Sequence, residues 1–212
     1  MQSAMRVLLC VVEYLKNLVG GFQRMELKTV YFENPGEENT DEVLRIARER
    51  AAQLGIKTIV VASVTGKTAV KAMEALSKFR VIIVTHCTGF AKPNTQEFSE
   101  ESRRIVESKG GTVLTVTPVF GGLSTAMRRK FKTHALGDIV ASTLRIFGDG
   151  MKEACEIVVT AADAGLVRTD EAVISIGGTN GGADTAIVCK PINAIDFWDW
   201  KMGEILCKPR FL

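Results

Sequence analysis

The hydrophobic and polar positions in the first half of the chain follow two rhythms in turn, one typical of strands and one of helices. Short runs of β-branched and apolar residues predict strands over residues 28–33, 58–62, 81–85 and 112–117. Between them, apolar residues that recur every three or four positions predict helices over residues 41–54, 68–77 and 99–109, the first of them capped by Asn39 or Thr40. Strands that alternate with helices of this length are typically parallel and joined by right-handed crossovers.

The second half of the chain is predicted to be more helical. Helical spacing covers residues 123–131, 137–147 and 152–164. In the last of these, the β-branched run 157–160 leaves a strand open as the alternative. Strands are also predicted at residues 172–176 and 185–190, antiparallel if they pair, with a short edge strand at residues 205–207. The whole pattern predicts a three-layer α/β/α sandwich with a mixed, mostly parallel sheet.

Residues 1–24 are predicted to form an amphipathic helical extension in front of an α/β domain of residues 25–212. The apolar run 7–12 is interrupted by Glu13, so it is too short for a membrane span and lacks the features of a signal peptide. Three roles stay open for the extension: packing on its own domain, an oligomer contact, or a poorly ordered segment.

The composition is that of a soluble globular domain, with 46% hydrophobic and 24% charged residues. A formal net charge of +3, with basic and acidic residues interspersed over 212 positions, argues against nucleic-acid binding. The five scattered cysteines match neither a disulfide framework nor a paired metal motif. They predict buried, inert thiols in a cytoplasmic protein, without a metal site.

The first candidate site is the loop after the strand 58–62, with the residues Ser63, Val64, Thr65, Gly66, Lys67 and Thr68. Gly66 allows a sharp turn, so that several backbone amides can converge on one point. The hydroxyl groups and the positive end of the following helix add to this effect and favour binding of a phosphate monoester. An ordinary loop with a helix cap explains the same spacing and stays open.

The Gly-Lys-Thr sequence of this loop does not make it the P-loop of a nucleoside triphosphatase. That motif requires a glycine five residues before Gly66, where this chain has Val61. In addition, the strand 81–85 is followed by His86 and not by an aspartate that could bind magnesium.

The second candidate site is the glycine-rich turn over residues 177–185. It contains Gly178, Gly181, Asp184 and Thr185. Its glycines and its asparagine exceed what a hairpin requires. Exposed amides, closure over a ligand or close approach to an aromatic ring would explain them, and a plain flexible loop is the alternative. Thr179 breaks the GxGxxG pattern, so a dinucleotide fingerprint is not supported.

The third candidate segment follows the strand 81–85 and contains Thr85, His86, Cys87, Gly89 and Phe90. His86 offers an imidazole for acid–base chemistry, but no Asp or Glu adjoins it in the sequence to orient the ring. A polar position in a cleft is therefore favoured over a catalytic one. A Cys87–His86 nucleophile pair is disfavoured, because neighbouring side chains at a strand end point in different directions.

Four further features have mainly structural interpretations. The basic run 128–132 is typical of a solvated helix face, with anchoring of an anionic ligand as the alternative. The aromatic cluster 197–200 favours a packed corner or a subunit interface, with stacking on a ligand ring as the alternative. Asp163 is interpreted as a polar residue at a helix end that could also reach the cleft, and His134 as a surface residue.

Several motifs taken together resemble a known family. The sequence from Ile59 to Ala69 resembles the phosphate-gripping loop of the pyruvate kinase C-terminal domain. Further motifs resemble free-standing archaeal proteins of this C-terminal domain type: VYFENPG at 30–36, ENT at 38–40, THCTGF at 85–90, AADAG at 161–165 and GGTNGGADTA at 177–186. The resemblance covers residues 28–210 and leaves out the extension.

The resemblance implies a three-layer fold with a mixed sheet and bound flavin mononucleotide (FMN). The FMN phosphate is expected on Ser63, Thr65, Gly66, Lys67 and Thr68. Ribityl and ring contacts are expected from Gly89, Phe90, Gly178, Gly181, Asp184 and Thr185. Pyruvate kinase activity is not implied, since the catalytic groups of that enzyme lie in a barrel domain for which this chain has no room.

Three functions remain open at this point. The first is an FMN-binding protein of unknown reaction, in which the flavin would carry any redox chemistry. The second is a non-enzymatic module that senses a phosphosugar or a nucleotide in the same loop. The third is a small enzyme that uses His86 as acid or base on a phosphorylated substrate. The expected partners are a small phosphorylated ligand and further copies of the chain, and neither nucleic acid nor a membrane is expected.

Overall fold

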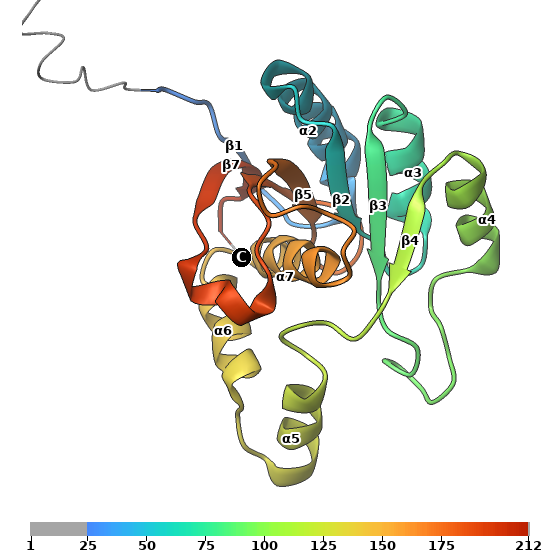
Figure 1. Cartoon of the computed structure of the whole chain (residues 1–212), viewed down its shortest axis with the longest axis vertical. Helices are drawn as coiled ribbons and strands as arrows, with labels where there is room; N and C mark the ends of the chain where they lie inside the picture. Colours follow the sequence, from blue (N-terminus) through green and yellow to red (C-terminus); the bar gives the residue numbers. More distant parts are fainter. Residues whose placement is uncertain (1–24, 212) are drawn as a thin grey trace, which may run out of the picture.

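The computed structural model describes residues 25–211, which form one α/β unit around a seven-stranded sheet (Figure 1). In spatial order the strands are β1 (Val30–Phe32), β7 (Met202–Pro209), β6 (Thr185–Cys189), β5 (Val173–Gly177), β2 (Thr58–Ala62), β3 (Arg80–Thr85) and β4 (Thr112–Thr115). All neighbours are parallel except that β6 is antiparallel to both β5 and β7. The predicted mixed, mostly parallel sheet is confirmed, whereas the predicted extension of residues 1–24 lies outside the described residues.

Helices cover both faces of the sheet, which gives the predicted three layers (Figure 1). One face is covered by α2 (Thr40–Leu54), α3 (Lys67–Ala75) and α4 (Glu100–Ser108), and the other by α7 (Asp149–Asp163). The centre of strand β2 is apolar because both of its faces are buried. Ile59 and Val61 join the core beneath α2 and α3, while Val60 joins the core beneath α7.

The remaining elements surround α7 and the start of α2. Helix α6 (Leu136–Arg145) packs on α7, and α5 (Leu123–Phe131) extends beyond the sheet from α6 (Figure 1). Two short 3₁₀ helices, η1 (Glu37–Asn39) and η2 (Ala194–Asp199), precede α2 and β7.

The structure decides two of the uncertain elements. The helix predicted over residues 152–164 is confirmed as α7, which spans Asp149–Asp163, and the β-branched run 157–160 lies inside it, buried between the sheet and α6. The strand predicted at residues 205–207 is confirmed as part of β7, but its predicted short length and edge position are wrong. Strand β7 has eight residues and lies between β1 and β6, because β1 pairs with it in parallel and takes the edge position. The charged residues Glu204 and Lys208 flank the apolar run 205–207, so the apolar pattern indicates only this central part of the strand.

Three of the four cysteines in the described residues are buried and free, namely Cys155, Cys189 and Cys207. Burial raises the pKa of the Cys155 and Cys207 thiols to about 12, and it also raises the pKa of Cys189. The predicted buried thiols are therefore confirmed for these three residues, whereas Cys87 is only half-buried.

We expect Cys87 to be the thiol of the described chain that iodoacetamide modifies in the folded protein. The thiolate is the reactive form, and the raised pKa of Cys155 and Cys207 keeps them protonated at about pH 8. Peptide mass spectrometry after alkylation with and without denaturant measures this. Equal labelling of Cys87 and Cys155 before unfolding would contradict the expected burial.

Candidate functional site

The three candidate segments meet at one edge of the sheet. They follow β2, β3 and β5, which are adjacent parallel strands, so their carboxyl ends lie side by side. A cleft of about 500 Å³ lies between them. Its lining residues are Glu37, Ala62, Ser63, Val64, Thr65, Lys67, Thr68, His86, Glu153, Gly178, Asn180, Gly181 and Gly182.

The loop after β2 is held rigidly between β3 and α4. The buried Ser63 donates its amide to the Val84 carbonyl at 3.0 Å, and its Oγ accepts the Ala69 amide at 3.2 Å, which caps α3. Gly66 has φ +105°, and a Cβ there would lie 2.2 Å from Cβ of Ser102 in α4. The turn therefore requires glycine for its backbone conformation and also for its packing.

This loop leaves hydrogen-bond donors free at the start of α3. The amides of Lys67 and Thr68 make no hydrogen bond to any residue that the structure describes, as expected for the first turn of a helix. The exposed Lys67 side chain has no ion-pair partner within residues 25–211 either. Free amides, a helix N-terminus and an unpaired ammonium group together form a positive end of the cleft.

Most of the excess glycine in the loop after β5 is explained by close packing. A Cβ at Gly178 would lie 2.3 Å from the Gly182 carbonyl oxygen, and one at Gly182 would lie 2.3 Å from Cα of Glu37. Gly181 differs, because its φ is +99° and a Cβ there would meet nothing within 4 Å. Of these three glycines, Gly181 is therefore the one that is not required by close packing.

Asp184 holds this glycine loop from behind. Its fully buried carboxylate accepts the amides of Gly36 and Thr179, each at 3.0 Å, and the Thr185 hydroxyl at 2.7 Å. It also lies against the first turn of α7, since a Cβ at Gly150 would be 2.3 Å from Asp184 Oδ1. Asp184 and Thr185 thus support the wall of the cleft and do not line it.

His86 has a carboxylate partner that the sequence analysis did not find. Its Nδ1 lies 2.8 Å from Glu97 Oε2, and its ring lies on the Phe90 ring with 3.9 Å between the centroids. Glu97 is held in place because the neighbouring Gln96 side chain donates to the His86 carbonyl at 2.9 Å and the next residue, Phe98, is buried in the core. His86 and Glu97 therefore form an oriented pair beside the cleft.

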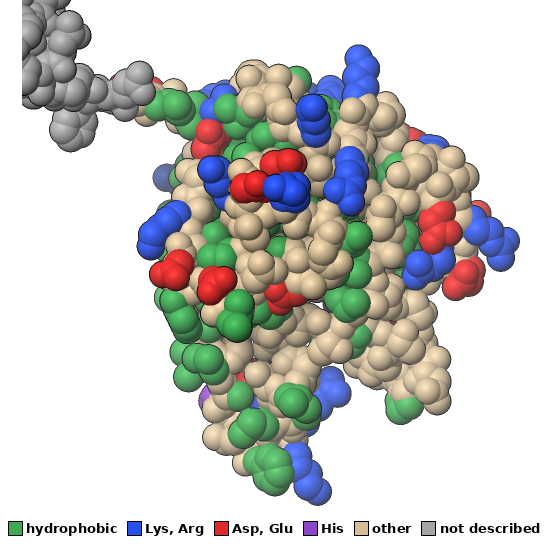
Figure 2. Space-filling view, in the orientation of Figure 1, with side chains coloured by type: hydrophobic (Ala, Val, Ile, Leu, Met, Phe, Trp, Pro, Cys, Tyr) green, Lys and Arg blue, Asp and Glu red, His purple; other side chains and the backbone are tan. Residues whose placement is uncertain are grey.

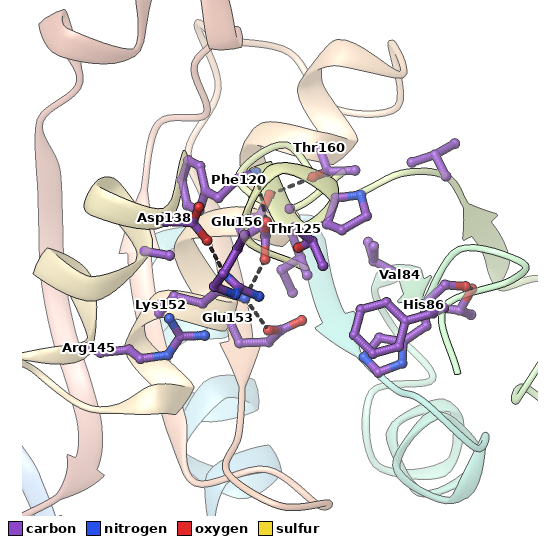
Figure 3. Close-up of a pocket in the computed structure, with 18 residues that line it drawn as sticks. Val84, His86, Phe120, Thr125, Asp138, Arg145, Lys152, Glu153, Glu156 and Thr160 are labelled. Carbon is purple, nitrogen blue, oxygen red and sulfur yellow. Dashed lines mark hydrogen bonds and ion pairs between the residues drawn. The ribbon is translucent and has the colours of Figure 1, made fainter. Parts of the chain in front are cut away.

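A second, smaller pocket of about 150 Å³ adjoins the cleft and shares His86 and Glu153 with it. Figure 3 shows Lys152 on one side of this pocket, between Glu153 and Glu156, with His86 on the opposite side. Burial of Lys152 disfavours its charge, but the two carboxylates outweigh this effect and raise its pKa above the ordinary value. Buried Glu156 also accepts the Phe120 amide at 2.8 Å.

The expected binding residues thus fall into four groups. Lining the cleft are Ser63, Val64, Thr65, Lys67, Thr68, Gly178 and Gly181. Thr85 and Phe90 line the adjoining pocket, whereas Gly66, Asp184 and Thr185 lie behind the cleft surface. Gly89 lies in the exposed part of the loop after β3 and lines neither space.

Other candidates lie away from the cleft. Asp163 is at the C-terminal end of α7, where it accepts the Asn193 side chain and the Ala194 amide, each at 3.0 Å. Glu37 and Glu153 line the cleft without any signal in the sequence, because they come from η1 and from the second turn of α7. In the described residues no group of three or more His, Cys, Asp or Glu side chains is arranged to hold a metal ion. Within the same residues, no helix is long and apolar enough to cross a membrane.

Comparison with protein families gives a match that agrees with this fold. The family described as pyruvate kinase, alpha/beta domain, matches residues 41–189, more than two thirds of the chain. A pyruvate kinase from Cryptosporidium parvum is 14% identical, with 71% of this chain and 22% of that chain covered and a TM-score of 0.37. The pyruvate kinase of the same organism in complex with ADP is 15% identical, with 70% and 22% covered and a TM-score of 0.35. An O-ureido-L-serine synthase variant is 18% identical, with 50% and 28% covered and a TM-score of 0.28. This chain spans about a fifth of the length of these pyruvate kinases.

Proposed function

Because this chain belongs to the pyruvate kinase alpha/beta domain family, we propose that it binds a phosphorylated small molecule in the cleft beside β2, with FMN as the first candidate. The observation that carries this proposal is the free positive end of the cleft. There the unbonded amides of Lys67 and Thr68 and the unpaired Lys67 ammonium group can share one phosphate.

The residues of the cleft suit the chemical parts of FMN. Lys67, Thr65 and the α3 amides would hold the phosphate. The carboxylates of Glu37 and Glu153 line the same cleft and would accept hydrogen bonds from ribityl hydroxyl groups. The His86 and Phe90 rings lie next to this cleft and offer the stacked aromatic surface that a flat ring requires. A volume of about 500 Å³ is in the range of small-molecule sites.

In this proposal the chain binds and orients the flavin, and the flavin carries out the electron transfer. Bound flavin would supply reversible hydride and single-electron chemistry. The α3 end would fix the position of the phosphate, and His86, held by Glu97, would present an exchangeable proton at the edge of the cleft.

We expect the purified full-length chain to bind FMN in a one-to-one ratio. Titration followed by flavin fluorescence and by calorimetry measures this, and mass spectrometry of small molecules released on denaturation identifies a ligand that is retained through purification. Riboflavin should bind at least about tenfold more weakly, because it lacks the phosphate that would interact with the N-terminus of α3. Equal affinity for both compounds would contradict the role of the loop.

The same titration separates FMN binding from effector sensing. If the chain does not bind FMN, but sugar phosphates or mononucleotides raise its melting temperature, it would be a sensing module that uses the same loop. Failure to bind any phosphorylated compound, including inorganic phosphate, would remove both candidates together.

The His86–Glu97 pair favours a second candidate function, acid–base chemistry on a phosphorylated substrate. A carboxylate at 2.8 Å from Nδ1 fixes the ring and leaves Nε2 as the group that can exchange a proton with a substrate. Both His86 and the phosphate-binding residues line the same cleft.

For this candidate we expect His86→Ala to abolish turnover while phosphate binding is unchanged. Glu97→Gln should lower kcat by about tenfold or more, since it leaves the ring without its orienting charge. The measurement is turnover in a screen of phosphorylated metabolites, with binding followed in parallel by calorimetry. An active His86→Ala variant would exclude the ring as acid or base.

A further inference from the structure

Large apolar side chains are exposed along η2, α6 and α5. Figure 2 shows hydrophobic side chains gathered on the lower left of the molecule, over η2 and down to the tip of α5. We call this surface the apolar strip. Its residues, each exposed by 40% to 90%, are Leu123, Met127, Phe131, Leu136, Ile139, Ile146, Phe147, Ile195 and Trp198.

Helix α6 lies at the centre of the apolar strip and is apolar on two sides. Val140 and Ala141 face inward and form a small core with Phe120. On its outer side, Leu136 and Ile139 are exposed, and a shallow groove runs past Ile139. A helix that is apolar on opposite faces is normally covered on both. The inner face has its partner in this chain, and the outer face has none within the residues described.

The area of the apolar strip is large for the free surface of a monomer. Phe131, Phe147 and Trp198 are exposed by 69%, 52% and 70%. These three rings alone present roughly 400 Å², and the six aliphatic side chains add at least as much. The largest apolar patch of a typical monomer is about 300 to 600 Å², whereas a stable interface takes about 800 Å² from each partner.

The two ends of the apolar strip carry opposite charges. At the α5 end are Arg129, Lys130 and Lys132, and at the η2 end are Asp196 and Asp199. These five exposed side chains have no hydrogen-bond or ion-pair partner among residues 25–211. Arg128 is not in this set, because it pairs with the buried Asp138. The surface thus has a basic end, an apolar centre and an acidic end.

We propose that the apolar strip is the interface of a twofold-symmetric homodimer. A twofold axis through α6 sets the α5 end of one copy on the η2 end of the other, because the same surface is used by both subunits in opposite directions. The basic end then meets the acidic end twice, and the outer face of α6 is covered by its own copy. This charge pattern is what selects a second copy of the chain over an unrelated apolar partner.

The test is sedimentation equilibrium of the full-length chain with four variants. The parent should be a dimer at about 10 μM, as expected for an interface of this size. Ile139→Asp should weaken the dimer at least about 100-fold, since it places an unpaired charge at the centre. Lys130→Glu should weaken it about tenfold, and the added change Asp199→Lys in the same chain should restore most of this loss. Lys57→Glu, which makes the same charge change away from the apolar strip, is the control.

This inference is independent of the ligand, because none of these side chains lines the cleft, and FMN titration should give the same affinity for all four variants. A parent that sediments as a monomer overturns the proposal. So does an oligomer that Ile139→Asp leaves intact, since another surface must then hold it together. If the double variant regains nothing, the opposed pairing of the two ends is wrong. A monomer that cosediments with anionic lipid vesicles would assign the apolar strip to a membrane instead.

Discussion

Replacing Lys67 by glutamate is expected to weaken the binding of FMN and of inorganic phosphate by about 100-fold without lowering the melting temperature. The lysine lies at the first position of α3 and faces the cleft without an ion-pair partner among the described residues. A glutamate there repels a phosphate. The same negative charge interacts favourably with the helix N-terminus, so the fold gains slightly or is unchanged. Phosphate binding is therefore weakened without a loss of stability.

Calorimetry with FMN, together with thermal unfolding of each variant, measures both effects. The control is Lys57→Glu, an exposed lysine just before β2, at the end of the sheet opposite the cleft. It should leave affinity within about twofold of the parent, because the distance exceeds the range of screened charges. Unchanged affinity in Lys67→Glu would disprove the phosphate site. A bulky residue at Gly66 is a poorer test, since its side chain would collide with Ser102 and disturb α4.

The layered fold could be predicted from the sequence because its signal is local. Strands buried on both faces are apolar at every position, as in residues 59–61 of β2, and helices beside them are apolar on one side only. Strand β7 was the exception. Its position next to β1 depends on pairing between residues that are almost the whole chain apart, such as Val30 with Cys207. No local pattern encodes that pairing.

The candidate site could be predicted only in part, because local patterns do not encode contacts between residues that are far apart in the sequence. Loops that follow parallel strands gather at one end of the sheet, so the predicted strands indicated a shared end for the loops that contain Ser63, His86 and Gly178. That β2, β3 and β5 are neighbours, which brings these loops to one cleft, is known from the structure. Glu97 and Glu153 could not be found in this way, because their positions depend on how a long loop and the start of α7 pack. Glycine content was also ambiguous, since close packing and ligand contact both require residues without a Cβ.

Asp184 shows how a conspicuous polar residue in a binding loop can serve the fold, and its removal should give the largest loss of stability. Asp184→Ala leaves the amides of Gly36 and Thr179 and the Thr185 hydroxyl buried without an acceptor. We expect a cost of about 4 kcal/mol, and a melting temperature about 10 °C lower, from three unsatisfied donors. Scanning calorimetry measures the change, and Asp184→Asn, which keeps one acceptor oxygen, should lose less.

The matched control is Asp170→Ala, since the Asp170 carboxylate is exposed and its ion-pair partner among the described residues is the exposed Arg168. It should change stability by less than about 0.5 kcal/mol. The Asp184→Ala variant should also lose amide-exchange protection at Thr179 first, because this carboxylate joins the loop after β5 to the turn before η1. If Asp184→Ala unfolds at the same temperature as the parent, the carboxylate does not hold the loop, and a direct contact with the ligand becomes the better explanation for it.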